Sequence, residues 1–324
     1  MRAEAGFLLR GLLAHVAWYE RSLKRRAHTG GTDNARYCYS VWLRHLVKLR
    51  QAGFEAPLGC VAELGPGDSA GTGIAALLSG AERYVALDVF PYSNRASWAR
   101  LLDELVPLFA GRSPIPGPAE FPEIRPCLES YEFPARHVDE RGVEPGRVKR
   151  LREEMARPDS TCVRYVCPWF SSRQLERASI DVLYSQAVME HVLDLEGAYR
   201  AMYEWLKPGG CASHVVDFRS HGVSGAWNGH WRFPEPLWRF AVSRREFTLN
   251  RRPLSHHLDC ARRAGFEVYY QKVDERRDGL ARRALARPFR NLTEEDLRAS
   301  GAHLILRKPR IPNAARGYLS PPGT

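Results

Sequence analysis

The chain has 324 residues, of which 44% are hydrophobic and 10% aromatic, and its formal net charge is +11 at pH 7. This length and composition can fill one large core or two small ones, which excludes a disordered or fibrous protein. The N-terminal apolar stretch, residues 7–19, is broken by Arg10 and His15 and followed by Lys24-Arg25-Arg26. We therefore expect no membrane span, no cleaved signal and a cytoplasmic protein.

Two amphipathic helices are predicted before the first strand. Apolar residues recur at three- and four-residue intervals over 8–19 and again over 39–49, with a glycine-containing loop at 29–33 between them. From residue 60, short apolar runs alternate with helical stretches, which is typical of a parallel sheet covered on both faces. The predicted strands are Val61–Leu64, Tyr84–Leu87, Val163–Val166, Ile180–Tyr184 and Cys211–Asp217. The predicted fold class is therefore α/β.

Two irregular segments interrupt this alternation. Residues 111–160 contain eight of the 22 prolines together with three aromatic residues, so we expect an insertion that packs onto the domain and includes a helix over 148–155. A second segment, 218–236, is rich in Trp, His and Gly and is a candidate acceptor loop. The predicted organisation is a helical extension or lid (1–57), a main domain (58–310) and a tail (311–324).

The cysteines and the charge bear on whether the protein has disulfides or zinc and whether it binds an anionic partner. Seven cysteines without a C-x-x-C pair favour reduced thiols over a disulfide framework or a structural zinc site. The whole charge excess lies from Arg219 onward, with 21 basic and 10 acidic residues. This region could attract an anionic partner such as phosphate, a glycan or nucleic acid. We favour solvated, arginine-rich helix faces, and keep an anionic acceptor as the alternative.

The segment VAELGPGDSAGTG, residues 61–73, combines a strand, a glycine-rich turn and a helix start. Gly65 and Gly67 permit a close approach of ligand to backbone. Asp88 ends the next strand 23 positions after Gly65, where nucleotide-binding α/β folds carry the acceptor for ribose hydroxyls. Glu63, just before the turn, would repel a pyrophosphate but could accept from an ammonium group. The pattern therefore favours S-adenosylmethionine over a dinucleotide.

Three further segments follow this motif in order: IDVLYSQAVMEHV at 180–192, LKPGG at 206–210 and AGFEV at 264–268. Over about residues 60–270 the sequence resembles the class I S-adenosylmethionine-dependent methyltransferases, and within them a bacterial group similar to methyltransferase type 11. The resemblance implies a Rossmann-like, seven-stranded sheet and S-adenosylmethionine as cofactor. In this chain Ser69 replaces the third glycine of the commonest family turn.

The resemblance also implies roles for particular residues. Glu63, Gly65 and Gly67 would line the methionine end of the cofactor, Asp88 would accept from the ribose, and Gln186 would lie beside the sulfonium. The family's acidic adenine contact is replaced by Cys167-Pro168-Trp169, so Trp169 or Phe90 is expected to stack on the base. The N-terminal segment would fold over the cofactor or cover the sheet edge. The predicted cofactor-binding residues are Arg36, Tyr37, Glu63, Gly65, Gly67, Asp68, Asp88, Val89 and Gln186.

Methyl transfer from a sulfonium is an in-line displacement that needs positioning and exclusion of water, and no metal. A hydroxyl acceptor would need a general base, most often histidine. His221, just beyond the fifth strand, is our first candidate, because ligands of open α/β sheets bind beyond the carboxyl ends of strands. His230, between two tryptophans, is the second. For His191, after the fourth strand, we favour a structural role over a catalytic one.

The predicted function is methyl transfer to a small-molecule or glycan acceptor, with oxygen as the favoured acceptor atom. An NAD(P)-dependent oxidoreductase and a nucleic-acid-binding or -modifying protein remain alternatives. Against nucleic acid, Ser185-Gln186-Ala187 follows the fourth strand instead of the Asn/Asp-Pro-Pro-aromatic loop that holds a flipped base, and no RNA-binding aromatic motif or zinc finger is present.

Overall fold

The computed structural model describes residues 2–13, 31–93, 96–157, 159–169, 171–245 and 247–310. Of the first predicted helix, the described part is α1 (Arg2–Leu13). Its expected continuation to residue 19, the start of the 29–33 loop and the 311–324 tail lie outside the described residues.

One seven-stranded sheet forms the centre of the molecule, in the order β3-β2-β1-β4-β5-β7-β6. Strands β1 to β5 are parallel, and β7 runs antiparallel to both β5 and β6. The bounds are β1 (Cys60–Leu64), β2 (Arg83–Leu87), β3 (Val163–Val166), β4 (Ile180–Gln186), β5 (Leu206–Asp217), β6 (Glu267–Glu275) and β7 (Ala299–Arg307). The predicted Rossmann-like α/β class is confirmed.

Strand β5 begins earlier than predicted. The LKPGG segment, residues 206–210, precedes the predicted Cys211–Asp217 but belongs to the strand, and Leu206 pairs with Ile180 of β4. The register shifts between Ile180 and Val182, so the extra residues are absorbed as a bulge.

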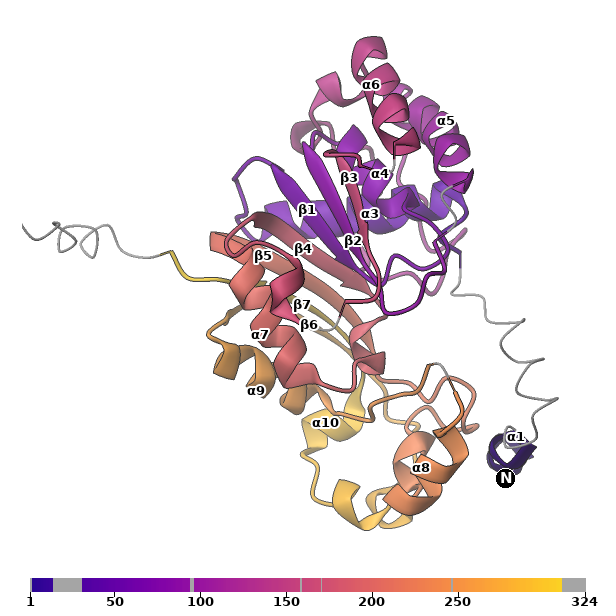
Figure 1. The fold of residues 1–324 in the computed structure, drawn as a ribbon. Coiled ribbons are helices and arrows are strands. Elements are labelled where there is room, and N and C mark those ends of the chain that lie inside the picture. The colour runs from indigo at the N-terminus through magenta and orange to yellow at the C-terminus, as the bar shows by residue number, and fades with distance from the viewer. Residues whose placement is uncertain are drawn as a thin grey trace, which may run out of the picture.

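Helices cover both faces of the sheet (Figure 1). On one face lie α3 (Ala35–Gln51), α4 (Gly71–Leu78) and α5 (Ala96–Ala110); on the other lie α7 (Leu195–Trp205) and α9 (Leu254–Ala264). Strand β1 shows why both are needed. Val61 packs toward α3 and α4, while its neighbours Cys60 and Ala62 pack toward α7 and α9, so every residue of the strand is buried.

The proline-rich insertion packs down as expected. Its helix α6 (Pro145–Ala156) is longer than the predicted 148–155. The fully buried Arg44 of α3 holds the irregular part, since its guanidinium donates to the carbonyls of Pro116, Ile124 and Pro126. One buried cation thus satisfies backbone acceptors that no strand or helix pairs.

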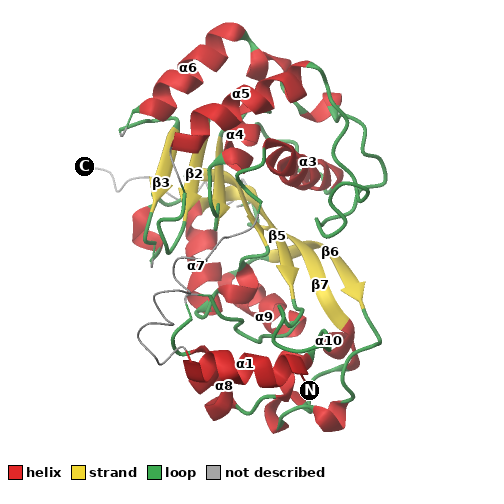
Figure 2. Cartoon of the chain, turned by 90° about the vertical axis from the view of Figure 1, so that its right-hand side faces the viewer, coloured by secondary structure: helices red, strands yellow, loops and turns green. Residues whose placement is uncertain are grey.

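A second, smaller lobe lies beyond the sheet (Figure 2) and contains α1, α8 (Glu235–Val242) and α10 (Glu294–Arg298). Phe7 of α1 contacts the rings of Phe233 and Trp238, at 5.3 and 5.4 Å between centroids. Helices α1 and α3, which we assigned to one N-terminal extension, therefore pack on different parts of the molecule: α1 on the segment after β5, and α3 on the sheet.

The basic final third pairs many of its charges with acidic side chains. Such exposed ion pairs stabilise the fold little, but they place these cations beside carboxylates of the same chain. Eight arginines are paired in this way: Arg219, Arg232, Arg239, Arg262, Arg263, Arg276, Arg282 and Arg298. A ninth, Arg251, is buried and pairs with Glu235. Within the described residues no helix has the length and apolar character that crossing a bilayer requires.

Candidate functional site

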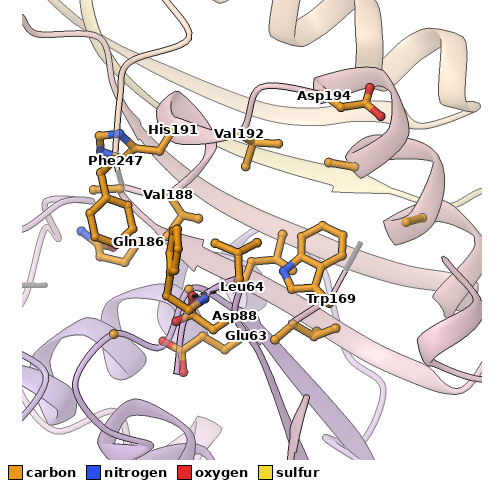
Figure 3. A pocket seen from close by; sticks show the side chains of 18 of the residues that line it. Glu63, Leu64, Asp88, Trp169, Gln186, Val188, His191, Val192, Asp194 and Phe247 are labelled. Atoms are coloured by element: carbon orange, nitrogen blue, oxygen red, sulfur yellow. Dashed lines mark hydrogen bonds between the residues drawn. The ribbon is translucent and has the colours of Figure 1, made fainter. Parts of the chain in front are cut away.

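A cavity of about 1030 Å³ opens at the carboxyl ends of β1, β2 and β4. Glu63 and Asp88 lie at its centre, Trp169 lies at one side, and His191 and Phe247 lie together at another (Figure 3). Ligand pockets commonly measure about 300–1,000 Å³. This cavity is therefore large enough for a nucleoside cofactor and part of a second molecule.

The glycine turn forms the floor of the cavity. Gly65 and Gly67 both have positive φ angles, +66° and +71°, which favour glycine. A Cβ on Gly65 would lie 2.6 Å from Cγ2 of Val188, so the turn has no room for a side chain there. Thr32, which precedes α3, stabilises the turn, because its hydroxyl accepts a hydrogen bond from the Asp68 backbone N–H at 2.8 Å.

Glu63 is a buried acid, with 2% of its surface exposed. The Tyr84 hydroxyl donates to its carboxylate at 2.5 Å. Burial raises the pKa of Glu63 to about 7, and the hydrogen bond from Tyr84 only partly opposes this shift. No basic side chain is among the residues whose charge affects its pKa. The cavity thus contains a desolvated carboxylate suited to a cationic ligand group.

Asp88 ends β2 and is 6% exposed. Its Oδ1 accepts from the backbone N–H groups of Val89 and Phe90, at 2.7 and 3.2 Å. Burial raises the pKa of Asp88, and these hydrogen bonds oppose the shift. They also fix the orientation of the carboxylate. Phe90 and Trp169, the predicted stacking residues, both line the cavity.

His191 is the one of the three candidate histidines that lines the cavity. Its Nδ1 lies 3.2 Å from the carbonyl oxygen of Thr248. A carbonyl can only accept, so Nδ1 carries the proton. Burial, with a smaller contribution from His221, lowers the pKa of His191 to about 4. The ring is therefore neutral at pH 7, and Nε2 has a free lone pair.

His221 lies behind His191 and outside the cavity lining, with 5.3 Å between the ring centroids. Its Nε2 is 3.2 Å from Oδ2 of Asp217, which Arg219 also contacts. Burial alone would raise the pKa of Asp217, but the hydrogen bonds from His221 and Arg219 hold it well below its usual range. His230 is 2% exposed, and burial lowers its pKa to about 3. It lies outside the lining.

The cavity gathers most of the residues that the sequence singled out: Tyr37, Glu63, Gly65, Gly67, Asp88, Val89, Gln186 and His191. It does not include Arg36, whose guanidinium forms a two-point ion pair with Glu120 on the surface, at 2.7 and 2.6 Å. Asp68 is also absent from the lining.

Sequence reasoning missed Thr32 and Phe247, which both line the cavity. Thr32 belongs to the loop that we noted without assigning it a role. Phe247 lies far from any motif, and only the path of the chain after α8 brings it beside His191, at 6.2 Å between ring centroids.

Comparison with known proteins adds a family match. The family model described as a methyltransferase domain matches residues 137–213, which include β3, β4, α7 and most of β5 but not the glycine turn. No curated protein matches.

Several solved structures are similar over most of this chain. They include a sarcosine dimethylglycine methyltransferase candidate from Galdieria sulphuraria (12% identity, TM-score 0.41, 82% of this chain and 85% of that one). A Mesorhizobium loti S-adenosylmethionine-dependent methyltransferase has 16% identity and a TM-score of 0.39, and the match covers 86% of this chain and 100% of that one. Haemonchus contortus phosphoethanolamine N-methyltransferase 2 has 15% identity and a TM-score of 0.41, and the match covers 93% of this chain and 60% of that one.

The family match and the glycine turn agree with the cavity at the carboxyl ends of the parallel strands. Residues 137–213 thus match a methyltransferase domain, and the fold and the cavity are consistent with a class I S-adenosylmethionine-dependent methyltransferase.

Proposed function

We propose that the enzyme transfers a methyl group from S-adenosylmethionine to an oxygen of a small-molecule or glycan acceptor, with His191 as general base. The observation that carries this proposal is the single cavity joining Glu63 and Asp88 to the unprotonated Nε2 of His191. His191 replaces His221 as our first candidate because a base must reach the acceptor.

The residues present fit the cofactor. Glu63 offers a desolvated carboxylate to the ammonium group, and Asp88 offers Oδ2, which the Val89 and Phe90 amides do not occupy, to the ribose hydroxyls. Gly65 and Gly67 let the ligand approach the backbone. When bound, the cofactor supplies an electrophilic methyl group on a positively charged sulfur. The phosphate-free character of this ligand suits a cavity with a buried acid at its floor.

The opposite end of the cavity fits an acceptor with an apolar or aromatic face. Phe247 and Leu193 line it and remain 38% and 70% exposed. A hydroxyl held there would donate to Nε2 of His191 and lose its proton to that atom as the new C–O bond forms. Excluding water from this apolar end would also prevent hydrolysis.

Binding is the first test. Calorimetry should detect S-adenosylmethionine and its demethylated product, S-adenosylhomocysteine, and Asp88→Ala should weaken both by about 10- to 100-fold, because a hydrogen bond to a charged group is lost. Arg36→Ala is the matched control, and its affinity should stay within about twofold because Arg36 lies outside the cavity. The absence of binding heat with folded wild-type protein would refute the proposed function.

Cofactor affinity should rise with pH. With a pKa of about 7, Glu63 is mostly protonated at pH 6 and mostly ionised at pH 8, and only the ionised form attracts an ammonium group. The affinity should therefore increase by about tenfold from pH 6 to 8, with about half a proton released on binding at pH 7. Calorimetry in two buffers of different ionisation enthalpy measures that proton directly. In Glu63→Gln the pH dependence should be lost; if it persists, another group is responsible.

A further inference from the structure

A chain of buried polar side chains leads away from the cavity through the centre of the protein. His45 of α3 contacts Oε1 of Gln186 through Nε2, at 3.1 Å, and Oγ of Ser213 through Nδ1, at 2.7 Å. Ser213 of β5 also contacts Nε2 of His303 of β7, at 2.9 Å. His45 and Ser213 are 0% exposed and His303 is 3% exposed. Only Gln186 reaches the cavity.

When the Ser213 hydroxyl donates its O–H to one of its two histidine neighbours, it accepts from the other, and the hydrogen bonds in this chain run in one of two directions. Burial lowers the pKa of His45 to about 4 and that of His303 well below its usual value, so each ring is neutral and has one donor and one acceptor nitrogen. Reversing one hydrogen bond therefore reverses all of them. In one direction His303 donates to Ser213, Ser213 to His45, and His45 to the amide oxygen of Gln186. In the other, the Gln186 NH₂ group donates to His45, and His303 Nδ1 carries a proton.

His303, at the end of this hydrogen-bonded series away from the cavity, distinguishes the two directions. Nδ1 of His303 is buried and has no hydrogen-bond partner among the described residues. In the first direction this atom is an unpaired acceptor, and in the second it is an unpaired N–H donor. Orphaned buried N–H groups are rarer in folded proteins than under-satisfied acceptors. The first direction, toward the amide oxygen of Gln186, is therefore favoured.

We propose that His45 is a positioning residue, held by Ser213 and His303, that fixes the Gln186 amide with its oxygen inward and its NH₂ group toward the cavity. A free glutamine can offer a ligand either a donor or an acceptor. A glutamine fixed in this way offers only donors. The ligand group at Gln186 is therefore a hydrogen-bond acceptor such as an oxygen, either of the cofactor or of the methyl acceptor, and not an ammonium group.

This inference rests on the proposed function for the identity of the ligands, but its first test needs no ligand. In full-length protein labelled with ¹⁵N in histidine and in glutamine side chains, NMR reports which ring nitrogen is protonated. His45 and His303 should both carry the proton on Nε2 from pH 6.5 to 8. A proton on Nδ1 of His45 would overturn the proposal, whether or not the protein binds the cofactor.

Two matched serine variants test the positioning. Ser185→Ala is the control, since Ser185 contacts the buried His214 at 2.8 Å in the same way, but on the opposite face of the sheet. Ser213→Ala should shift the His45 ring and Gln186 side-chain signals, whereas Ser185→Ala should leave both unchanged. Unmoved Gln186 signals in Ser213→Ala would contradict the role of His45.

Titration with S-adenosylhomocysteine then separates the two sources of the oxygen. If the oxygen belongs to the cofactor, S-adenosylhomocysteine should shift the NMR signals of the Gln186 side-chain amide protons in the wild type. Ser213→Ala should then weaken binding of this ligand by at least about threefold, and Ser185→Ala should not. If it belongs to the acceptor, S-adenosylhomocysteine binds both variants as it binds the wild type. Failure of the wild type to bind this ligand would count against the proposed function and would leave the tautomer result standing.

Discussion

Acidification from pH 7 to pH 5 should unfold this protein in the absence of ligands. Six buried histidines are held neutral: burial lowers the pKa to about 4 for His45 and His191, to about 3 for His214, His230 and His257, and well below its usual value for His303. In the unfolded chain each would titrate near 6.5. The unfolded state therefore gains protons that the folded state cannot accept.

The sign and the size follow from proton linkage. A histidine with a lowered pKa contributes stability above pH 6.5, and this contribution is lost as the pH falls toward the folded value. Three buried carboxyls act in the opposite sense, since burial raises the pKa of Glu63 to about 7, that of Glu190 well above its usual value and that of Asp88 above its usual value. The net difference near pH 5.5 is about three protons, or about 4 kcal/mol per pH unit. The total stability of a domain is commonly about 5–15 kcal/mol.

Denaturant titrations at half-unit steps between pH 5 and 7 measure this slope. His257→Gln is a suitable variant because His257 is fully buried on the α9 face, away from the cavity. This substitution removes one of the titrating groups, so the slope should fall by about one proton. A wild-type slope corresponding to fewer than one proton would show that these histidines are not neutral in the folded state.

Replacement of His191 should have the largest effect on catalysis. With an acceptor found by screening extracts with methyl-labelled S-adenosylmethionine, His191→Gln should lower kcat by about 10²- to 10⁴-fold, the usual contribution of a positioned general base. Cofactor affinity should change by less than about threefold, because no predicted cofactor contact is removed. Steady-state kinetics and calorimetry on the same preparations separate the two quantities.

His221→Ala is the comparison that distinguishes the two histidines. His221 touches the ring of His191 but does not line the cavity, so its loss should lower kcat by only about tenfold. A larger loss in His221→Ala than in His191→Gln would restore the order that the sequence alone suggested. The pH profile offers a second check: because the pKa of His191 is about 4, kcat should not fall between pH 8 and 6.5 through its protonation.

The sequence predicted the fold, and it singled out residues at strand ends that the structure brings into one cavity, because both depend on local patterns. Buried parallel strands appear as short apolar runs, and the residues at their carboxyl ends are close in sequence to the glycine turn or to the next strand. Val163–Val166 was predicted at its observed bounds, and Glu63, Asp88 and Gln186 lie in one cavity as expected.

The acceptor end could not be predicted in the same way because long-range packing determines it. Position in the sequence made His221, after the fifth strand, the first candidate and favoured a structural role for His191, after the fourth. Only the folded chain shows that Thr248 and Phe247 contact His191. Arg36 had suitable chemistry, but Glu120 of the insertion pairs with it on the surface. His45 lies in an apolar helical pattern, and its role depends on partners 141, 168 and 258 residues away.

The contact of Phe7 with Phe233 and Trp238 also affects how the protein is made. At about 5–20 residues per second, a ribosome needs roughly 10 to 50 seconds after completing the first helix to synthesise its partner. During this interval the apolar face of α1 is exposed on the nascent chain, where chaperones or neighbouring polypeptides can bind it. Nascent chains stalled before residue 233 should therefore leave Phe7 accessible to protease or to a site-specific crosslinker, and chains extended well past residue 242 should protect it.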